Sequence, residues 1–344
     1  MDKLEKILME DAAAVNKKVD LGLLCRKNII ITGASGLIGI NLLMSIKAFA
    51  LKIKDGDRPQ VTAVVFSGFP DHLRKAVDFK GLSVKKGDIA DPRFASSLPQ
   101  ADIIIHAAGY GQPGKFMQDK VKTVAINTSA TISLLEKLKP DGRFLFISSS
   151  EVYSGLSNPP YKEDQIGTTD TRHPRSCYIE GKRCGEAICN IYFEKGLNIR
   201  SARLSLAFGP GTKPGDMRVL NSFIEKGLNG KIELMDRGEA KRTYCYISDA
   251  VEIMWDILLS GKEPIYNVGG FSRTTIAGLA KKIGHALKTE VIIPKDGKRL
   301  KGAPDDVRLD MSKAAKEFGK LKGDFVDFDK GLARTIEWQK ELYK

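Results

Sequence analysis

The feature that most constrains this chain is the alternation of short apolar runs with longer helical patterns through its first half. The runs are rich in β-branched residues and continuously apolar. Strands that alternate with helices form βαβ units in a parallel sheet, and continuous apolar character is typical of strands covered on both faces. We therefore predict an α/β fold with a doubly wound parallel sheet. The predicted strands are Asn28–Thr32, Val61–Phe66, Leu82–Lys85, Ile103–His106, Arg143–Ser148 and Ile199–Leu204.

The second half of the chain has a looser pattern. A Pro- and Gly-rich loop follows Gly209, and short helical and extended stretches come after it, which indicates a smaller C-terminal α+β lobe. An amphipathic helix with Leu4, Ile7, Leu8 and Val15 on one face is expected near the N-terminus. The expected division is a helical extension at 1–27, a main sheet domain at 28–204 to which 243–262 returns, and a substrate lobe formed by 205–242 and 263–344.

A glycine-rich loop joins the first predicted strand to the first long helix. It reads Thr32-Gly33-Ala34-Ser35-Gly36-Leu37-Ile38-Gly39. Glycine permits the tight turn and lets the backbone approach a pyrophosphate, and the helix N-terminus presents free N–H groups to the phosphates. The loop therefore predicts a dinucleotide-binding site in a Rossmann domain.

A tyrosine and a lysine stand four residues apart in a predicted helix, at Tyr178 and Lys182. This spacing places both on one helix face, where an ammonium favours the phenolate. Such a tyrosine can take a proton from an alcohol. Ser148, Ser149 and Glu151 follow the fifth predicted strand. Ligands of open parallel sheets bind at the carboxyl ends of the strands, so we expect these side chains to lie near the tyrosine.

Together these motifs resemble the extended short-chain dehydrogenases/reductases, the branch of nucleotide-sugar epimerases, dehydratases and decarboxylases. The resemblance runs from about Asn28 to Lys340. It implies a cofactor of NAD, with NADP as the alternative, and a nucleotide-diphosphate sugar as substrate. The catalytic residues that it implies are Ser149, Glu151, Tyr178 and Lys182. The cofactor-binding residues that it implies are Gly33, Ser35, Gly36, Leu37, Ile38, Gly39, Asp88, Ile89, Ala107, Ala108, Gly109, Tyr178 and Lys182.

One expected cofactor contact is missing from the sequence. An acid at the end of the second strand would bind the adenosine ribose, but this chain has Phe66-Ser67-Gly68 there. Asp71 could substitute for that acid, or Arg74 and Lys75 could meet a 2′-phosphate. The choice between NAD and NADP stays open at this point.

Glu151 separates the members of the family. Simple 4-epimerases generally lack a carboxylate here, whereas dehydratases and decarboxylases carry one. The run from Cys177 to Arg183 is similar to UDP-glucuronate decarboxylases, which implies substrate contacts at Ser150, Arg242 and Arg308. Leu206 and Gly211 replace an asparagine and an arginine of those decarboxylases. A 4,6-dehydratase or 4-epimerase therefore remains the alternative, and a non-catalytic NAD(P)-binding protein is a third.

The composition limits the classes of partner that we expect for this protein. Lys and Arg number 55 against 42 Asp and Glu, but no nucleic-acid motif accompanies the basic charge. The five cysteines form no C-x-x-C pair, so no metal site is expected. No apolar run is long enough to span a bilayer, and Met1–Leu24 does not resemble a signal peptide, so we expect a cytoplasmic protein without a membrane partner. The family resemblance implies a homodimer.

Overall fold

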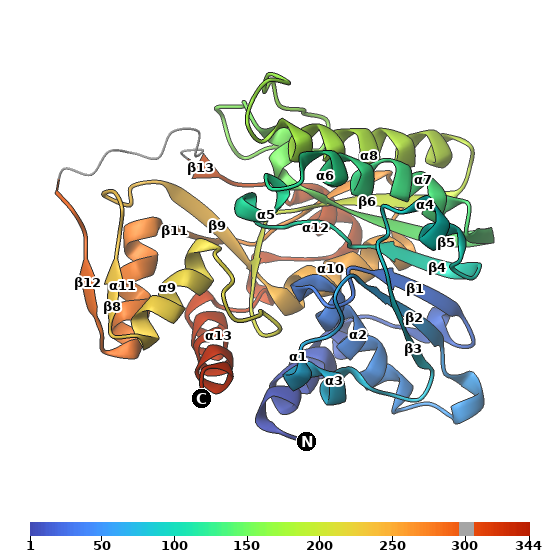
Figure 1. Cartoon of the computed structure of the whole chain (residues 1–344), viewed down its shortest axis with the longest axis horizontal. Coiled ribbons are helices and arrows are strands. Elements are labelled where there is room, and N and C mark those ends of the chain that lie inside the picture. Colours follow the sequence, from blue (N-terminus) through green and yellow to red (C-terminus); the bar gives the residue numbers. More distant parts are fainter. Residues whose placement is uncertain (296–305) are drawn as a thin grey trace.

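The computed structural model describes residues 1–295 and 306–344 of the chain. Its centre is a seven-stranded parallel sheet with the order β10-β6-β5-β4-β1-β2-β3 (Figure 1). The order reverses between β1 and β4, which is the crevice where doubly wound sheets bind ligands. The strands are β1 (Asn28–Thr32), β2 (Gln60–Val65), β3 (Leu82–Lys86), β4 (Ala101–His106), β5 (Leu138–Ser149), β6 (Asn198–Leu204) and β10 (Ile265–Val268). The predicted fold class is confirmed.

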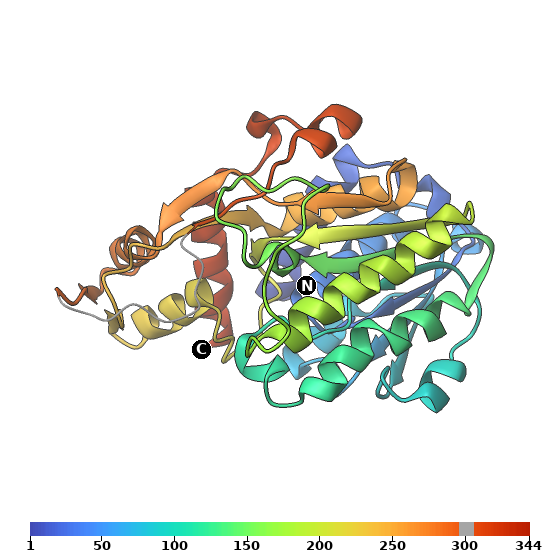
Figure 2. The same cartoon turned by 90° about the horizontal axis from the view of Figure 1, so that it is seen from above.

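Helices cover both faces of this sheet, as Figures 1 and 2 show. One apolar core joins the sheet to α1 (Lys3–Lys18), α2 (Leu37–Ala50), α3 (Asp71–Val77) and α10 (Ile247–Ser260). A second core lies on the opposite face, under α4 (Pro92–Ser96), α6 (Lys120–Asn127), α7 (Ser129–Leu135) and α8 (Ser176–Glu194). Burial on both faces explains why the strands are continuously apolar.

The N-terminal helix α1 is part of the main core. Leu4, Ile7, Leu8 and Val15 are all buried, as the amphipathic pattern predicted. The helix packs against α2, α3, α10 and α13 (Phe328–Leu342). Arg334 of α13 donates from Nε to Asp11 of α1 at 2.7 Å, which links the first helix to the last.

A smaller lobe lies beyond the carboxyl ends of the large sheet (Figure 1). It contains a four-stranded sheet made of β7 (Leu206–Phe208), β9 (Lys241–Tyr246), β11 (Ser272–Thr275) and β13 (Asp306–Val307). It also contains the two-stranded sheet of β8 (Lys231–Glu233) and β12 (Glu290–Ile292). The helices α9 (Val219–Leu228) and α11 (Ile276–Leu287) pack against each other beside it.

The remaining helices are short. They are α5 (Pro113–Phe116), α12 (Ser312–Phe318), η1 (Gly22–Leu24), η2 (Asp55–Asp57), η3 (Ser150–Tyr153) and η4 (Lys322–Asp324). No helix within 1–295 and 306–344 combines the length and apolar character needed to cross a membrane.

The chain crosses between the two lobes at positions that differ from the expected ones. Residues 243–246 belong to β9 of the small sheet, and only the helix after them, α10, returns to the large sheet. β10 lies within the segment expected in the substrate lobe, yet it pairs with β6 as the edge strand of the large sheet. A strand of four residues after a Gly-Lys-Glu-Pro turn carries too little pattern to reveal which sheet it joins.

Candidate active site

The glycine loop at the end of β1 packs closely against neighbouring backbone because two of its residues have no side chain. Gly33 has φ +65°, and a Cβ there would lie 2.4 Å from the carbonyl oxygen of Ala107. A Cβ on Gly39 would lie 2.4 Å from the carbonyl oxygen of Gly33. Gly36 is the N-cap of α2, so the free N–H groups of that helix face the loop. The glycines therefore bring the backbone of the predicted cofactor loop, with Ser35, Leu37 and Ile38, close to the segment after β4.

A buried histidine connects the loops after β1 and β4 through hydrogen bonds. Nε2 of His106 donates to the carbonyl of Ile126 at 2.9 Å, and Nδ1 lies 2.7 Å from the hydroxyl of Thr32. The backbone N–H of Ala108 donates to the same hydroxyl at 3.2 Å. Burial lowers the pKa of His106 to about 3, so the ring is neutral. This chain of bonds fixes the Ala107, Ala108 and Gly109 segment beside the glycine loop.

The predicted catalytic trio converges next to this segment. Ser149 ends β5, and Tyr178 and Lys182 lie in the first turns of α8. The ammonium of Lys182 lies 5.8 Å from the ring centre of Tyr178 and donates to the carbonyl of Ile147 at 2.6 Å. It also lies 3.8 Å from the position that a Cβ on Gly109 would take. Tyrosine, lysine and serine are thus brought together at the end of the cofactor groove.

Burial shifts the proton affinities of the pair in opposite directions. It lowers the pKa of Lys182 to about 7, although the carboxylate of Glu186 opposes this shift. It raises the pKa of Tyr178 to about 12, although a hydrogen bond from Ser149 and the charge of Arg175 act the other way. Both shifts disfavour the charged form, as desolvation requires. The tyrosine therefore depends on its neighbours for any stabilisation of its phenolate.

Glu151 lies in η3 and is paired with an arginine that the sequence did not single out. Arg175 is the N-cap residue of α8, and its Nη2 donates to Oε1 of Glu151. The guanidinium also lies 5.8 Å from the ring centre of Phe116, and that ring stacks on Tyr178 with centroids 4.7 Å apart. Within the described residues, the buried Nε of Arg175 has no hydrogen-bond partner. A second unpredicted arginine, Arg218, also favours the phenolate of Tyr178 electrostatically.

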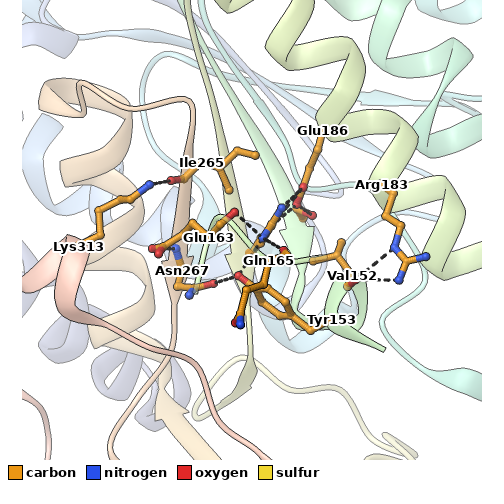
Figure 3. A network of polar contacts seen from close by, with 11 residues as sticks. Val152, Tyr153, Glu163, Gln165, Arg183, Glu186, Ile265, Asn267 and Lys313 are labelled. Carbon is orange, nitrogen blue, oxygen red and sulfur yellow. Dashed lines mark hydrogen bonds and ion pairs between the residues drawn. The ribbon is translucent and has the colours of Figure 1, made fainter. Parts of the chain in front are cut away.

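A buried polar network holds the trio's elements in place (Figure 3). Arg203 of β6 pairs with Glu186 of α8 through Nε and Nη2, at 2.8 to 3.1 Å. Ser148 donates to Glu186 at 2.5 Å, and Arg203 donates to the hydroxyl of Tyr153 at 2.9 Å. The Tyr153 hydroxyl in turn donates to Asn267 of β10 at 2.7 Å. The network therefore connects β5, β6, β10, η3 and α8.

The predicted substrate residues are spread over two lobes. Ser150 is the first residue of η3 and lies beside the trio in sequence. Arg242 is in β9, where it donates to the carbonyl of Lys241 at 2.7 Å. Arg308 comes directly after β13, which pairs with β9, so it lies at the end of a strand of the small sheet. Nη2 of Arg308 donates to the carbonyl of Pro159 at 3.0 Å, which ties the small sheet to the segment before α8.

Two further cofactor-side features were not predicted. Lys213, in the loop after β7, donates to Ser35 of the glycine loop at 3.3 Å. Lys122 of α6 pairs with Asp88 at 2.6 Å, next to Ile89 after β3. Isolated lysines in a chain with this much basic charge carry no recognisable sequence signal. Among the described residues, no group of His, Cys, Asp and Glu side chains is arranged to hold a metal ion.

Sequence comparison shows relatives that match over most of this chain. The NAD dependent epimerase/dehydratase family matches residues 29–269. UDP-glucuronic acid decarboxylase 6 of Arabidopsis thaliana is 30% identical over 299 residues, which cover 85% of this chain and 83% of that protein. UDP-glucuronic acid decarboxylase 1 of Xenopus tropicalis is 30% identical over 333 residues, which cover 92% of this chain and 73% of that protein.

Solved structures share the whole fold. An epimerase of Methanothermobacter thermautotrophicus superposes with a TM-score of 0.79 at 20% identity, covering 98% of this chain and 96% of that one. A dTDP-glucose 4,6-dehydratase of Streptomyces venezuelae, solved with NAD bound, superposes with a TM-score of 0.77 at 24% identity. That match covers 91% of this chain and 97% of the dehydratase.

Proposed function

Because the chain belongs to the NAD-dependent epimerase/dehydratase family, we propose that it is a nucleotide-sugar decarboxylase that uses NAD and acts on UDP-glucuronate through a 4-keto intermediate. The observation that carries this proposal is the convergence of Ser149, Tyr178 and Lys182 at the end of the glycine-loop groove, with the Glu151–Arg175 pair beside the tyrosine. The relatives that are named UDP-glucuronic acid decarboxylases, and that match over 85% and 92% of this chain, support the choice of substrate.

The first step is the oxidation of the sugar at C4, in which Ser149, Tyr178 and Lys182 take part. Tyr178 takes the proton of the sugar 4-hydroxyl, and Ser149 donates a hydrogen bond to the same oxygen. Arg175 and Arg218 stabilise the phenolate. Bound NAD supplies the redox chemistry by accepting a hydride from C4 and returning it later. Lys182 holds the end of β5 through the carbonyl of Ile147 and keeps its nitrogen under the tyrosine ring.

The second step is the loss of the carboxylate. A ketone at C4 is β to the C5 carboxylate, so the C5–carboxylate bond breaks, CO2 leaves and its electron pair enters the enolate. A proton then adds at C5, the C4–H bond is restored and Tyr178 returns its proton to the C4 oxygen, which gives a UDP-pentose. Arg175 can orient the substrate carboxylate through its unpartnered Nε, because guanidinium groups bind carboxylates well. Glu151 can hold the water that delivers the proton.

The larger part of the substrate would extend toward the small lobe. We assign Ser150 to the sugar and Arg242 and Arg308 to the diphosphate, because Arg308 directly follows the strand that pairs with Arg242 and reaches the segment before α8. Charge-assisted bonds from arginine suit phosphate oxygens. Within the described residues, the buried Nε of Arg308 has no partner, which leaves a donor for a ligand.

A 4,6-dehydratase is the second candidate, and Glu151 favours it. In that reaction the same ketone acidifies C5–H, Glu151 removes the proton and the 6-hydroxyl departs. Arg175 would then hold the Glu151 carboxylate in place through their ion pair. The two reactions differ in the fate of C6, because a uronate loses this carbon as CO2 and a hexose keeps it.

Product analysis tests the proposal. Purified protein is incubated with NAD and with UDP-glucuronate, UDP-glucose, dTDP-glucose or GDP-mannose, and products are identified by mass spectrometry and CO2 release. We expect CO2 and a UDP-pentose from UDP-glucuronate. The Tyr178→Phe variant should lose about 10²–10⁴-fold in turnover and still bind NAD. A 4-keto-6-deoxy product, or an epimer of unchanged mass, from a neutral sugar would contradict decarboxylation.

We also propose that the protein acts as a homodimer in the cytoplasm. Apolar side chains exposed on α6, α7 and α8 support the dimer. The five cysteines all carry free thiols, which suits a reducing compartment. Fractionation of cells that express a tagged chain would check the location.

A further inference from the structure

The carboxyl end of β2 departs most clearly from an ordinary dinucleotide site. In Rossmann domains an acid about 20 residues after the glycine motif binds the ribose 2′-hydroxyl of NAD, whereas a nearby arginine accommodates the 2′-phosphate of NADP. The residue after β2 in this chain is Phe66, which is 60% exposed. An apolar ring therefore stands where a discriminating carboxylate is expected.

The charged residues that follow Phe66 do not replace that carboxylate. Asp71 begins α3, its side chain is 91% exposed, and it pairs with Arg74 at 3.0 Å. Arg74 also approaches the carbonyl of Phe69, with its Nε at 3.5 Å. These two charges neutralise each other on the first turns of α3. Among the described residues, no contact holds the side chain of Asp71 or Arg74 toward the carboxyl end of β2.

A lysine from a different element fills the place instead. The ammonium of Lys122, on α6, lies 4.2 Å from the centre of the Phe66 ring. It also lies 2.6 Å from Oδ2 of Asp88, which follows β3. The other oxygen of Asp88 accepts the backbone N–H of Ala90 at 3.0 Å. The ring of Phe66 and the carboxylate of Asp88 together fix the position of the Lys122 ammonium.

The lysine is charged and has open space next to it. Burial acts to lower the pKa of Lys122, but Asp88 and Tyr110 outweigh it, so the pKa is raised. Its side chain is only 19% exposed, which limits screening by solvent. Gly68 continues the turn after Phe66 with φ +110°, and a Cβ there would meet no atom within 4 Å. A side chain at Gly68 would thus meet open space, and the acids that act on Lys122 are the paired Asp88 and Asp119, the N-cap residue of α6.

We propose that Phe66 and Lys122 form the adenosine-ribose subsite, and that this subsite accepts the 2′-phosphate of NADP as well as the 2′-hydroxyl of NAD. The Phe66 ring offers no charge to repel the phosphate, and the Lys122 ammonium offers a charge to attract it. Asp88 remains available to the adenine side through its fixed position. The proposal rests on the dinucleotide site of the proposed function and does not depend on the sugar substrate.

Binding titrations test this subsite without any turnover. The dissociation constants of NAD+ and NADP+ are measured by calorimetry for the full chain and for Phe66→Asp, Phe66→Leu and Lys122→Gln. For the unaltered chain we expect the two constants to lie within about tenfold of each other. Phe66→Asp should tighten NAD+ and weaken NADP+, which changes their ratio by about tenfold or more. Lys122→Gln should weaken NADP+ more than NAD+.

The Phe66→Leu variant is the matched control, because it removes the ring without adding charge. It should keep the ratio close to that of the unaltered chain. The proposal is overturned if the unaltered chain already prefers NAD+ by about 100-fold or more, or if Phe66→Asp leaves the ratio unchanged. Either result with intact NAD+ binding leaves the decarboxylase proposal standing. Failure to bind either dinucleotide would contradict both proposals.

Discussion

A neutral histidine inside the sheet shows how one residue can set the position of a binding loop. His106 is fully buried and connects Thr32 of β1 to the carbonyl of Ile126 in α6. The Thr32 hydroxyl also accepts a hydrogen bond from the backbone N–H of Ala108. Thr32 therefore connects the histidine to the segment that lies beside the glycine loop. A protonated ring could not accept the Thr32 hydrogen bond. The arrangement therefore requires the neutral form.

This requirement predicts an acid-sensitive fold. The unfolded chain takes up a proton on His106 near pH 6.5, whereas the folded chain takes it up only near pH 3, because burial lowers the pKa. Between these values the unfolded state binds more protons, so stability falls as the pH falls. His106→Gln removes the titration. We expect the destabilisation caused by this variant to shrink by roughly 1–2 kcal/mol between pH 6.5 and pH 4.5.

Urea denaturation at several pH values would measure this change. The informative quantity is the difference in unfolding free energy between the unaltered chain and His106→Gln, since carboxylates that titrate in both proteins cancel. A difference that is independent of pH would show that His106 does not control the acid response.

Sequence reasoning found the residues that stand inside motifs and missed those that reach the site from elsewhere. Tyr178 and Lys182 share a helix face because their spacing is helical, and Ser149 meets them because strand ends share one edge of the sheet. Phe116 and Lys122 come from two other helices, α5 and α6. Arg175 is an exception, because an arginine in the turn before Tyr178 could have been noticed as a neighbour. No local spacing encodes the other contacts.

At the scale of elements, the joint between α8 and β6 decides whether the catalytic helix stays in register with the sheet. Glu186 and Arg203 have side chains only 4% exposed, and both belong to the network of Figure 3. Glu186 also counteracts the burial of Lys182, four residues earlier on α8. One carboxylate thus serves the packing of the helix and the charge of Lys182.

Glu186→Gln tests these two effects by separate measurements, one of stability and one of the pH–rate profile. The substitution leaves the Arg203 guanidinium buried without a counter-charge, which costs about 3–5 kcal/mol of stability. It also lowers the pKa of Lys182 further below its ordinary value, because the carboxylate that raised it is gone. We expect a lower unfolding midpoint in urea and a shift of the pH–rate profile assigned to Lys182 toward lower pH.

Glu180→Gln is the control on the same helix. Glu180 pairs with Arg183 at 2.7 Å, but its side chain is 36% exposed, so its loss should cost no more than about 1 kcal/mol. The pH–rate profile should stay in place. A profile that does not move in Glu186→Gln, despite a lower stability, would limit Glu186 to a packing role.

The elements themselves were predictable where they were long or repeated. The strands from β1 to β6 lie within a few residues of their predicted places, because periodicity over many residues leaves few alternatives. The helical segment between β4 and β5 includes two helices, α6 and α7, that meet at Thr128 with φ −116° and ψ −83°. The sheet to which β9 and β10 belong depends on long-range pairing, which no local pattern reveals.

At the scale of the whole molecule, one side of the large sheet exposes apolar side chains that a monomer would leave in water. Val121 is 82% exposed and Val124 37% exposed on α6, Ile132 is 41% exposed on α7, and Ile191 is 52% exposed on α8. The three helices lie together on one face (Figure 1), and α8 packs against both α6 and α7. Cys184 of α8 is exposed as well. A clustered apolar surface of this kind is typical of an interface.

A second copy of the chain is the partner that we expect on this surface. Light scattering after size-exclusion chromatography should give twice the chain mass of 37.8 kDa. The double variant Val121→Lys, Ile191→Lys places two ammonium groups in the interface and should run as a monomer, because buried unpaired charges are strongly unfavourable. Met235→Lys is the matched control, since Met235 is 76% exposed near β8 in the other lobe, and it should remain dimeric. A monomeric unaltered chain, or a double variant that stays dimeric, would show that these helices face solvent.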